Sequence, residues 1–252
     1  MLTVEKDLIV VKFGSETVTN GHGMDQGRLD NYARQLDKLP NDLIVVSSGA
    51  VRAGQALAPD ILDDQISAGI GSAEVVAAWA RAFRRFNRMV AQVLVTDHEL
   101  SDEVEGDIFF NSLRKCIRTN VVPIVNTNDL LSNEELPKRR WKGENDRPAS
   151  HIAQVMGAEI LLLLTEKNGL FDDSGNTIRE VPYDLKVHEN ILDMTKARNK
   201  ANKVDTMQAI FAKTLASIEA AGNGVQVYMA GADQDFEAIL AGKTGTHFAA
   251  AA

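Results

Sequence analysis

The sequence has little cysteine and no long hydrophobic run. A single cysteine, Cys116, stands among the 252 residues, which excludes an intrachain disulfide and a thiolate metal cluster and fits a reducing compartment. No apolar stretch approaches the roughly 20 residues of a transmembrane helix. The first apolar run is short and is interrupted by Lys12, so we expect neither an N-terminal signal nor a membrane span. These absences predict a cytoplasmic protein.

The chain also has little excess positive charge. Its formal net charge is −8, and its basic residues are scattered apart from one cluster near residue 200. This balance argues against general binding to nucleic acid or to an anionic membrane, so small anionic substrates would have to meet local positive charge. The sequence contains no repeat, no Pro/Gly-rich linker, no zinc-ligand spacing and no Walker phosphate loop. We therefore expect one domain over residues 1–252.

The first apolar run ends in a lysine and a glycine. Residues 8–11 are apolar and β-branched, which predicts a buried strand, and Lys12, Gly14 and Ser15 follow it. In open α/β sheets ligands bind at the carboxyl ends of strands, where glycine lets the backbone approach a phosphate and lysine supplies a point charge. The alternative is a surface lysine beside an ordinary turn.

Apolar runs alternate with helical patterns along the rest of the chain. This alternation favours a parallel sheet flanked by helices. Trp79, Phe83 and Phe86 fall at helical spacing and are interpreted as core residues. The expected strands cover residues 43–46, 89–95, 121–125, 159–164 and 225–229, and the expected helices cover 24–39, 61–88 with a possible break at 69–72, 108–118 and 204–221.

Small polar residues follow two further strands and begin one helix. Residues 47–50 read Ser-Ser-Gly-Ala and residues 126–129 read Asn-Thr-Asn-Asp, which suits either a polar ligand or ordinary turns with Ser48 as a helix cap. Asn145 or Asp146 begins a helix, whose N-terminus favours anions. We expect Asn145 to hold a carboxylate and Asp146 to orient other groups. Residues 130–141 could form a hairpin or lid.

Taken together, five segments resemble the glutamate 5-kinase branch of the amino acid kinase family. They are VVKFGSETVT, VVSSGAVRAG, VPIVNTND, KGENDRPAS and LLLLTEKNGLF, in this order, and the likeness extends from Leu8 to the Gly-Thr-His-Phe of residues 245–248. The resemblance implies a three-layer αβα sandwich around a mainly parallel sheet of about eight strands. Many family members carry a C-terminal PUA domain, for which this chain is too short.

The resemblance also implies a reaction and the residues that perform it. The reaction is transfer of the ATP γ-phosphate to the side-chain carboxylate of L-glutamate, giving the acyl phosphate of proline biosynthesis, with Mg²⁺ bound along with the ATP. Lys12 would contact the transferring phosphate and Asp146 would orient the catalytic lysines. Feedback inhibition by proline and assembly into dimers or tetramers are further family expectations. Glutamate would be held by Ser48, Gly49, Asp129 and Asn145, and ATP by Lys12, Gly14, Ser15, Thr165 and Glu166.

The sequence departs from the family pattern at the nucleotide loop. The family's Gly-Gly-Met-x-Thr-Lys aligns with residues 201–206, so both glycines are lost and Thr206 stands at the lysine position. We predict that Lys203, which would lie one helical turn before Thr206, replaces that lysine in catalysis and ATP binding. Less favoured substitutes are Lys196, Arg198 and Lys200, and the alternative is that the whole basic cluster is a solvated face. Two other functions stay open: a weak or inactive regulator that binds glutamate or proline, and a kinase for a different acid.

Overall fold

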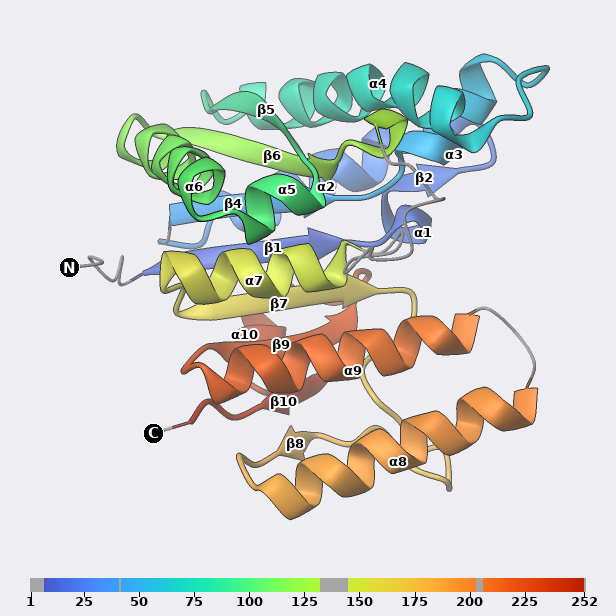
Figure 1. Cartoon of the computed structure of the whole chain (residues 1–252), viewed down its shortest axis with the longest axis vertical. Helices are drawn as coiled ribbons and strands as arrows, with labels where there is room; N and C mark the ends of the chain where they lie inside the picture. The colour runs from blue at the N-terminus through green and yellow to red at the C-terminus, as the bar shows by residue number, and fades with distance from the viewer. Residues whose placement is uncertain (1–6, 41, 132–144, 203–205, 252) are drawn as a thin grey trace.

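One mainly parallel sheet forms the centre of the protein. The computed structural model describes residues 7–40, 42–131, 145–202 and 206–251. The eight strands lie in the order β5-β6-β4-β1-β7-β9-β10-β8, and every neighbouring pair is parallel except β9 and β10 (Figure 1). Their bounds are β1 Leu8–Phe13, β4 Asp42–Ser47, β5 Met89–Val95, β6 Val121–Thr127, β7 Ile160–Thr165, β8 Glu180–Val181, β9 Gln226–Gly231 and β10 Thr246–Phe248. A short hairpin of β2 Thr19–Asn20 and β3 Gly23–Met24 stands apart.

Helices cover both faces of this sheet, so the predicted three-layer α/β architecture is confirmed. Each face has its own hydrophobic core. One face carries α1 Ser15–Val18, α2 Gln26–Leu36, α3 Ala50–Leu57, α4 Asp64–Arg84 and α10 Phe236–Leu240. The other carries α5 Asp97–Ser101, α6 Glu103–Arg118, α7 Asp146–Met156, α8 Leu185–Asn202 and α9 Thr206–Gly222. Among the described residues, none of these helices has the length and apolar content that crossing a membrane requires.

The alternation of side chains along β1 decides where Lys12 points. Leu8 and Val10 belong to the core beneath α7 and α9, whereas Ile9 and Val11 belong to the core beneath α2 and α4. Because successive strand side chains point to opposite faces, Lys12 projects to the same face as Val10. The strand end therefore presents its lysine toward α7 and α9.

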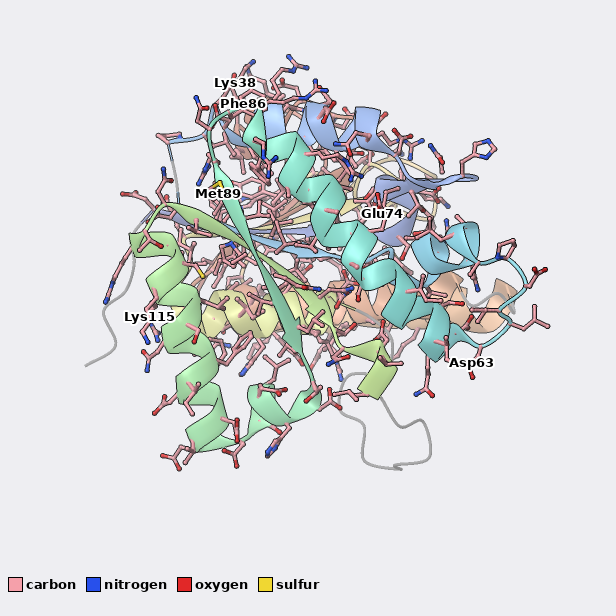
Figure 2. All side chains as sticks on the ribbon, turned by 90° about the horizontal axis from the view of Figure 1, so that it is seen from above. Lys38, Asp63, Glu74, Phe86, Met89 and Lys115 are labelled. Atoms are coloured by element: carbon pink, nitrogen blue, oxygen red, sulfur yellow. The ribbon has the colours of Figure 1, made fainter. Side chains whose placement is uncertain are left out.

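The helix α4 is continuous, so the break expected at residues 69–72 is wrong. Figure 2 shows an unbroken helix between the labelled residues Asp63 and Phe86. Glycine serves close packing here: a Cβ on Gly71 would lie 1.9 Å from the carbonyl oxygen of Ala50 in α3. The interpretation of Trp79 as core is confirmed, since it is fully buried and its Nε1 donates to Ser47 Oγ at 2.9 Å.

Helix α6 begins earlier than the apolar pattern predicted. The residues before 108 form the short helix α5, capped by Thr96 and Glu99, and then the start of α6, capped by Asp102. Asp102 accepts hydrogen bonds from the backbone N–H groups of Val104 and Glu105, and its carboxylate is thereby stabilised at the positive end of the helix. Cys116 lies partly buried on the same helix as a free thiol, in agreement with a packing role.

Candidate active site

The candidate site forms where the carboxyl ends of neighbouring parallel strands meet. Strand β1 lies between β4 and β7, and β6 lies beyond β4. Backbone bonds tie the turns that leave these strands together: Ser48 N–H donates to Phe13 O at 3.1 Å, and Gly14 N–H donates to Leu164 O at 3.4 Å. The predicted pocket-forming turns are therefore adjacent at one edge of the sheet.

A buried ion pair joins Lys12 to the first residue of α7. Lys12 Nζ lies 2.6 Å from Asp146 Oδ1, and the two side chains are 4% and 0% exposed. Ions buried this deeply are expensive to desolvate and persist only when they are paired and hydrogen-bonded. The structure thus brings together the lysine from β1 and the aspartate predicted to orient it.

A second lysine, Lys213, lies on the other oxygen of the same carboxylate. Its Nζ is 2.8 Å from Asp146 Oδ2, and its side chain is 16% exposed. It reaches the site from α9, which packs against α7 (Figure 1). Burial by itself would raise the pKa of Asp146, but the two ammonium groups outweigh that effect and hold its pKa below the usual value. Two cations from different elements therefore share one buried anion.

Sequence reasoning did not find Lys213. It assigned the second lysine to Lys203, which lies outside the described residues. Of the substitutes, Lys196 is engaged elsewhere: its Nζ lies 3.8 Å from Asp193 and over the ring of Phe211. One feature of the sequence could have identified Lys213: it stands within the mostly apolar helical sequence Phe-Ala-Lys-Thr-Leu. A lysine at such a position is rarely buried unless it pairs with a buried anion.

Side-chain hydrogen bonds link the ends of β4 and β6 to the start of α7 beside this cluster. Asn145 Nδ2 donates to Ser48 Oγ at 2.9 Å and to Asn126 Oδ1 at 3.2 Å. Asn126 and Asn145 are both more than nine-tenths buried, yet Asn126 Nδ2 and Asn145 Oδ1 have no hydrogen-bond partner among the described residues. Buried polar atoms are normally paired, so one free donor and one free acceptor mark a place for a polar ligand. Asn126 was noted in its motif but was missed as a site residue.

Two glycines lie in the turns that form the site. Gly49 has φ of 109° and caps α3, and a Cβ on it would lie 3.0 Å from Val18 Cγ2. Gly14 precedes α1, of which Ser15 is the first residue. The position of Gly49 therefore requires glycine, whereas Gly14, with φ of −72°, would accept a Cβ at ordinary contact distances.

The remaining predicted residues lie at the ends of β6 and β7. Asp129 is the first residue of the 3₁₀ helix η1 Asp129–Leu131, directly after β6. Thr165 ends β7, and its Oγ1 donates to Lys167 O at 2.5 Å. Glu166 follows and is exposed. All three residues lie at the carboxyl ends of β6 and β7, at the same edge of the sheet as Lys12 at the end of β1.

The chain is similar to known proteins both in sequence and in fold. The model of the "Amino acid kinase family" matches residues 7–230. Glutamate 5-kinase of Mycolicibacterium gilvum is 31% identical over 96% of the chain and 67% of its own length, and that of Mycobacterium tuberculosis is 32% identical over 96% and 66%. The chain thus spans about two thirds of the length of these relatives. In fold it is similar to carbamate kinase from Giardia lamblia bound to AMP-PNP, with a TM-score of 0.63, 12% identity and full coverage of both chains.

Proposed function

Because the chain belongs to the amino acid kinase family, we propose that it phosphorylates the side-chain carboxylate of L-glutamate with ATP, as its glutamate 5-kinase relatives are named to do. The product would be glutamyl 5-phosphate, the acyl phosphate that enters proline biosynthesis. The reaction is a phosphoryl transfer between two anions. Such a transfer asks the protein mainly for positioning and for positive charge at the transferring group.

The observation that carries this proposal is the pairing of Lys12 and Lys213 on Asp146. Asp146 holds both ammonium groups at one edge of the sheet, at 2.6 and 2.8 Å, where their positive charge can stabilise a transferring phosphoryl group. Because all three side chains are mostly buried, this charge acts in a medium of low effective dielectric and is poorly screened. We assign Lys12 and Lys213 as catalytic residues and Asp146 as the residue that positions them.

The acceptor would bind along the hydrogen-bonded side chains of Ser48, Asn126 and Asn145. Asn126 Nδ2 offers a donor to a carboxylate oxygen, and Asn145 Oδ1 offers an acceptor to an ammonium group. Ser48 and Gly49 would line the same place, and Asp129 would meet the substrate ammonium. This combination suits an amino acid that carries both charges.

ATP would bind over the ends of β1 and β7, near Gly14, Ser15, Thr165 and Glu166. Mg²⁺ would enter with the nucleotide, because this ion keeps several waters and takes few protein ligands. Within the described parts of the chain, no three acidic, histidine or cysteine side chains gather as a cation site. The ion would therefore depend on the phosphates of ATP. A cytoplasmic location, homo-oligomers and inhibition by proline remain predictions.

The proposal is tested by detecting the acyl phosphate itself. Purified protein with ATP, Mg²⁺ and L-glutamate should release ADP and, when hydroxylamine is added, give the glutamyl hydroxamate. ADP release without hydroxamate would indicate ATP hydrolysis and contradict the proposal.

The same assay separates the alternatives. Faster hydroxamate formation with aspartate or acetylglutamate would assign a different acid substrate. The loss of the family's loop lysine was the motive for an inactive regulator, and Lys213 removes that motive because Asp146 still holds a second ammonium group. Glutamate binding in calorimetry without any binding of ATP would restore the regulator.

A further inference from the structure

A polar cleft opens beside helix α1. It measures about 540 Å³ and lies between α1, the β2–β3 hairpin, the start of α2, helix α3 and the residue that follows Thr165. That volume falls within the range of small-molecule sites, roughly 300–1,000 Å³. The side chains of opposite charge that line it are Glu16, Arg28, Arg52 and Glu166.

An exposed ion pair bridges this cleft. Arg52 Nη2 lies 2.7 Å from Glu16 Oε1, and the side chains are 49% and 44% exposed. Glu16 stands on α1, after the turn of Gly14 and Ser15, and Arg52 stands on α3, after the turn of Ser48 and Gly49. The pair therefore connects the two turns that are assigned to ATP and to the acceptor. Exposed ion pairs contribute only about 0–1 kcal/mol, so the partners can be exchanged at little cost.

The second oxygen of Glu16 lies over Gly14. Its Oε2 is 3.7 Å from where a Cβ on Gly14 would be. One carboxylate thus contacts a guanidinium group and also lies near the glycine that the proposed function assigns to the phosphate. An oxyanion of a substrate that approached Gly14 would be repelled by this carboxylate and attracted by Arg52.

We propose that Arg52 binds an oxyanion of a substrate, and that this oxyanion replaces the Glu16 carboxylate as the partner of the guanidinium group. The guanidinium fork matches a carboxylate and a phosphate equally well, so the shared chemistry is that of a planar or tetrahedral oxyanion from the acid or from ATP. Arg28 is the less suitable group, since its Nη1 already donates to Glu16 O at 2.8 Å and its Nε pairs with Asp25. The inference rests on the proposed function, because it takes Gly14 to lie on the path of the phosphate.

The test compares variants of the two partners, since a ligand-binding role predicts opposite effects. Calorimetric titration with Mg-ATP, and separately with L-glutamate, gives a Kd for the full-length wild type, Arg52→Ala and Glu16→Gln. For the ligand that uses the cleft, Arg52→Ala should weaken binding about tenfold, through loss of a charge-assisted contact. Glu16→Gln should tighten binding severalfold by removing the competing carboxylate. Whichever titration responds identifies the source of the oxyanion.

Matched controls come from the ion pair between Arg81 and Glu74 on α4, which are bonded at 2.6 Å and have similar exposure. Arg81→Ala and Glu74→Gln repeat the charge changes and should leave both Kd values within about twofold of the wild type. The inference is overturned if Arg52→Ala matches its control, or if both cleft variants shift binding in the same direction, as a merely structural pair would. A wild type that binds neither probe would contradict the proposed function itself and the inference with it.

Discussion

Lys213 Nζ lies 2.8 Å from Asp146 Oδ2, although the two residues come from different helices and are far apart along the chain. The contact exists because α9 packs against α7, which places a side chain from the middle of α9 beside the first residue of α7. Its consequence is that the altered loop at residues 201–206 does not leave Asp146 with only one cation.

Replacing Lys213 tests this directly. Lys213→Met should lower kcat about a hundredfold or more, as the loss of one group that stabilises transition-state charge typically does. Lys203→Ala is the matched comparison, because it removes a lysine from the segment that the sequence had favoured. Steady-state ADP release measures both. Full activity in Lys213→Met combined with an inactive Lys203→Ala would return the catalytic role to Lys203.

Neutralising Asp146 should damage both activity and stability. Asp146→Asn leaves two ammonium groups close together without their anion, and breaking a buried pair in this way costs about 3–5 kcal/mol. The midpoint of urea unfolding should fall and turnover should be lost. Asp25→Asn is the control: asparagine caps a helix about as well as aspartate, so only the partly exposed ion pair with Arg28 is lost, and the change should cost about 0–1 kcal/mol.

The contribution of Asp146 to the stability of the fold should depend on pH. Because the folded-state pKa of Asp146 lies below its ordinary value of 3.8, its stabilising contribution is complete above that pH and is lost as the pH falls further. Asp146→Asn should therefore flatten the acid limb of the stability curve below pH 3.8 and leave its slope above pH 5 unchanged. An identical acid limb in the variant would show that Asp146 is not its source.

The strand ends of this fold were predictable because each is marked by a local pattern. Residues 8–11 form a continuous apolar run, which is typical of a strand that is buried on both faces, and the lysine and glycine after it stand in the sequence itself. Helix α4 was harder, because Gly71 resembles a break and in fact permits close contact with Ala50. A single sequence does not distinguish these two uses of glycine.

The second lysine could not be found in the same way. Its role depends on a contact between α7 and α9, and no short motif surrounds it. Asn126 was visible as part of a polar strand end, yet only its burial and its unpartnered Nδ2 distinguish it from Asn128 nearby. Pairing across the fold is information that hydrophobic periodicity does not carry.

Asn126 should contribute to binding of the acid and not to binding of ATP. Asn126→Ala removes the unpartnered Nδ2 and also the oxygen to which Asn145 Nδ2 donates. The KM for the acid should therefore rise about tenfold, which is a usual cost when a buried polar group is left unpaired. The KM for ATP should stay within twofold. Asn111→Ala on the exposed face of α6 is the control, and an equal rise of both KM values in Asn126→Ala would indicate general damage to the site.

The buried hydroxyl of Tyr32 should make the stability of the fold fall in alkali. This hydroxyl donates to Thr17 O at 3.0 Å, and burial raises its pKa from 10.0 to about 12. Because the unfolded state releases this proton first, folding free energy is lost as the pH rises from 10 to 12. Tyr32→Phe should lower the free energy of unfolding by about 1 kcal/mol at pH 7, because the hydrogen bond is lost. Between about pH 10 and 12 the free energy of unfolding of the variant should fall less steeply with pH than that of the wild type. Tyr228, whose pKa burial also raises, keeps part of the slope. Tyr183→Phe, at an exposed position, should leave the stability at pH 7 within about 0.5 kcal/mol of the wild type.

The packing of α3 on α4 should hold in place the turn of Ser48 and Gly49, which is assigned to the acceptor. A Cβ on Gly71 would lie 1.9 Å from Ala50 O, at the start of the helix that follows Ser48 and Gly49. Gly71→Ala forces the two helices apart, so it should cost about 1–3 kcal/mol in urea unfolding and raise the KM for the acid. Gly27→Ala in α2, where a Cβ meets only an ordinary contact at 3.5 Å, should be neutral or stabilising by up to about 1 kcal/mol. If Gly71→Ala instead behaves like Gly27→Ala, the close approach of α3 and α4 does not hold the acceptor turn in place.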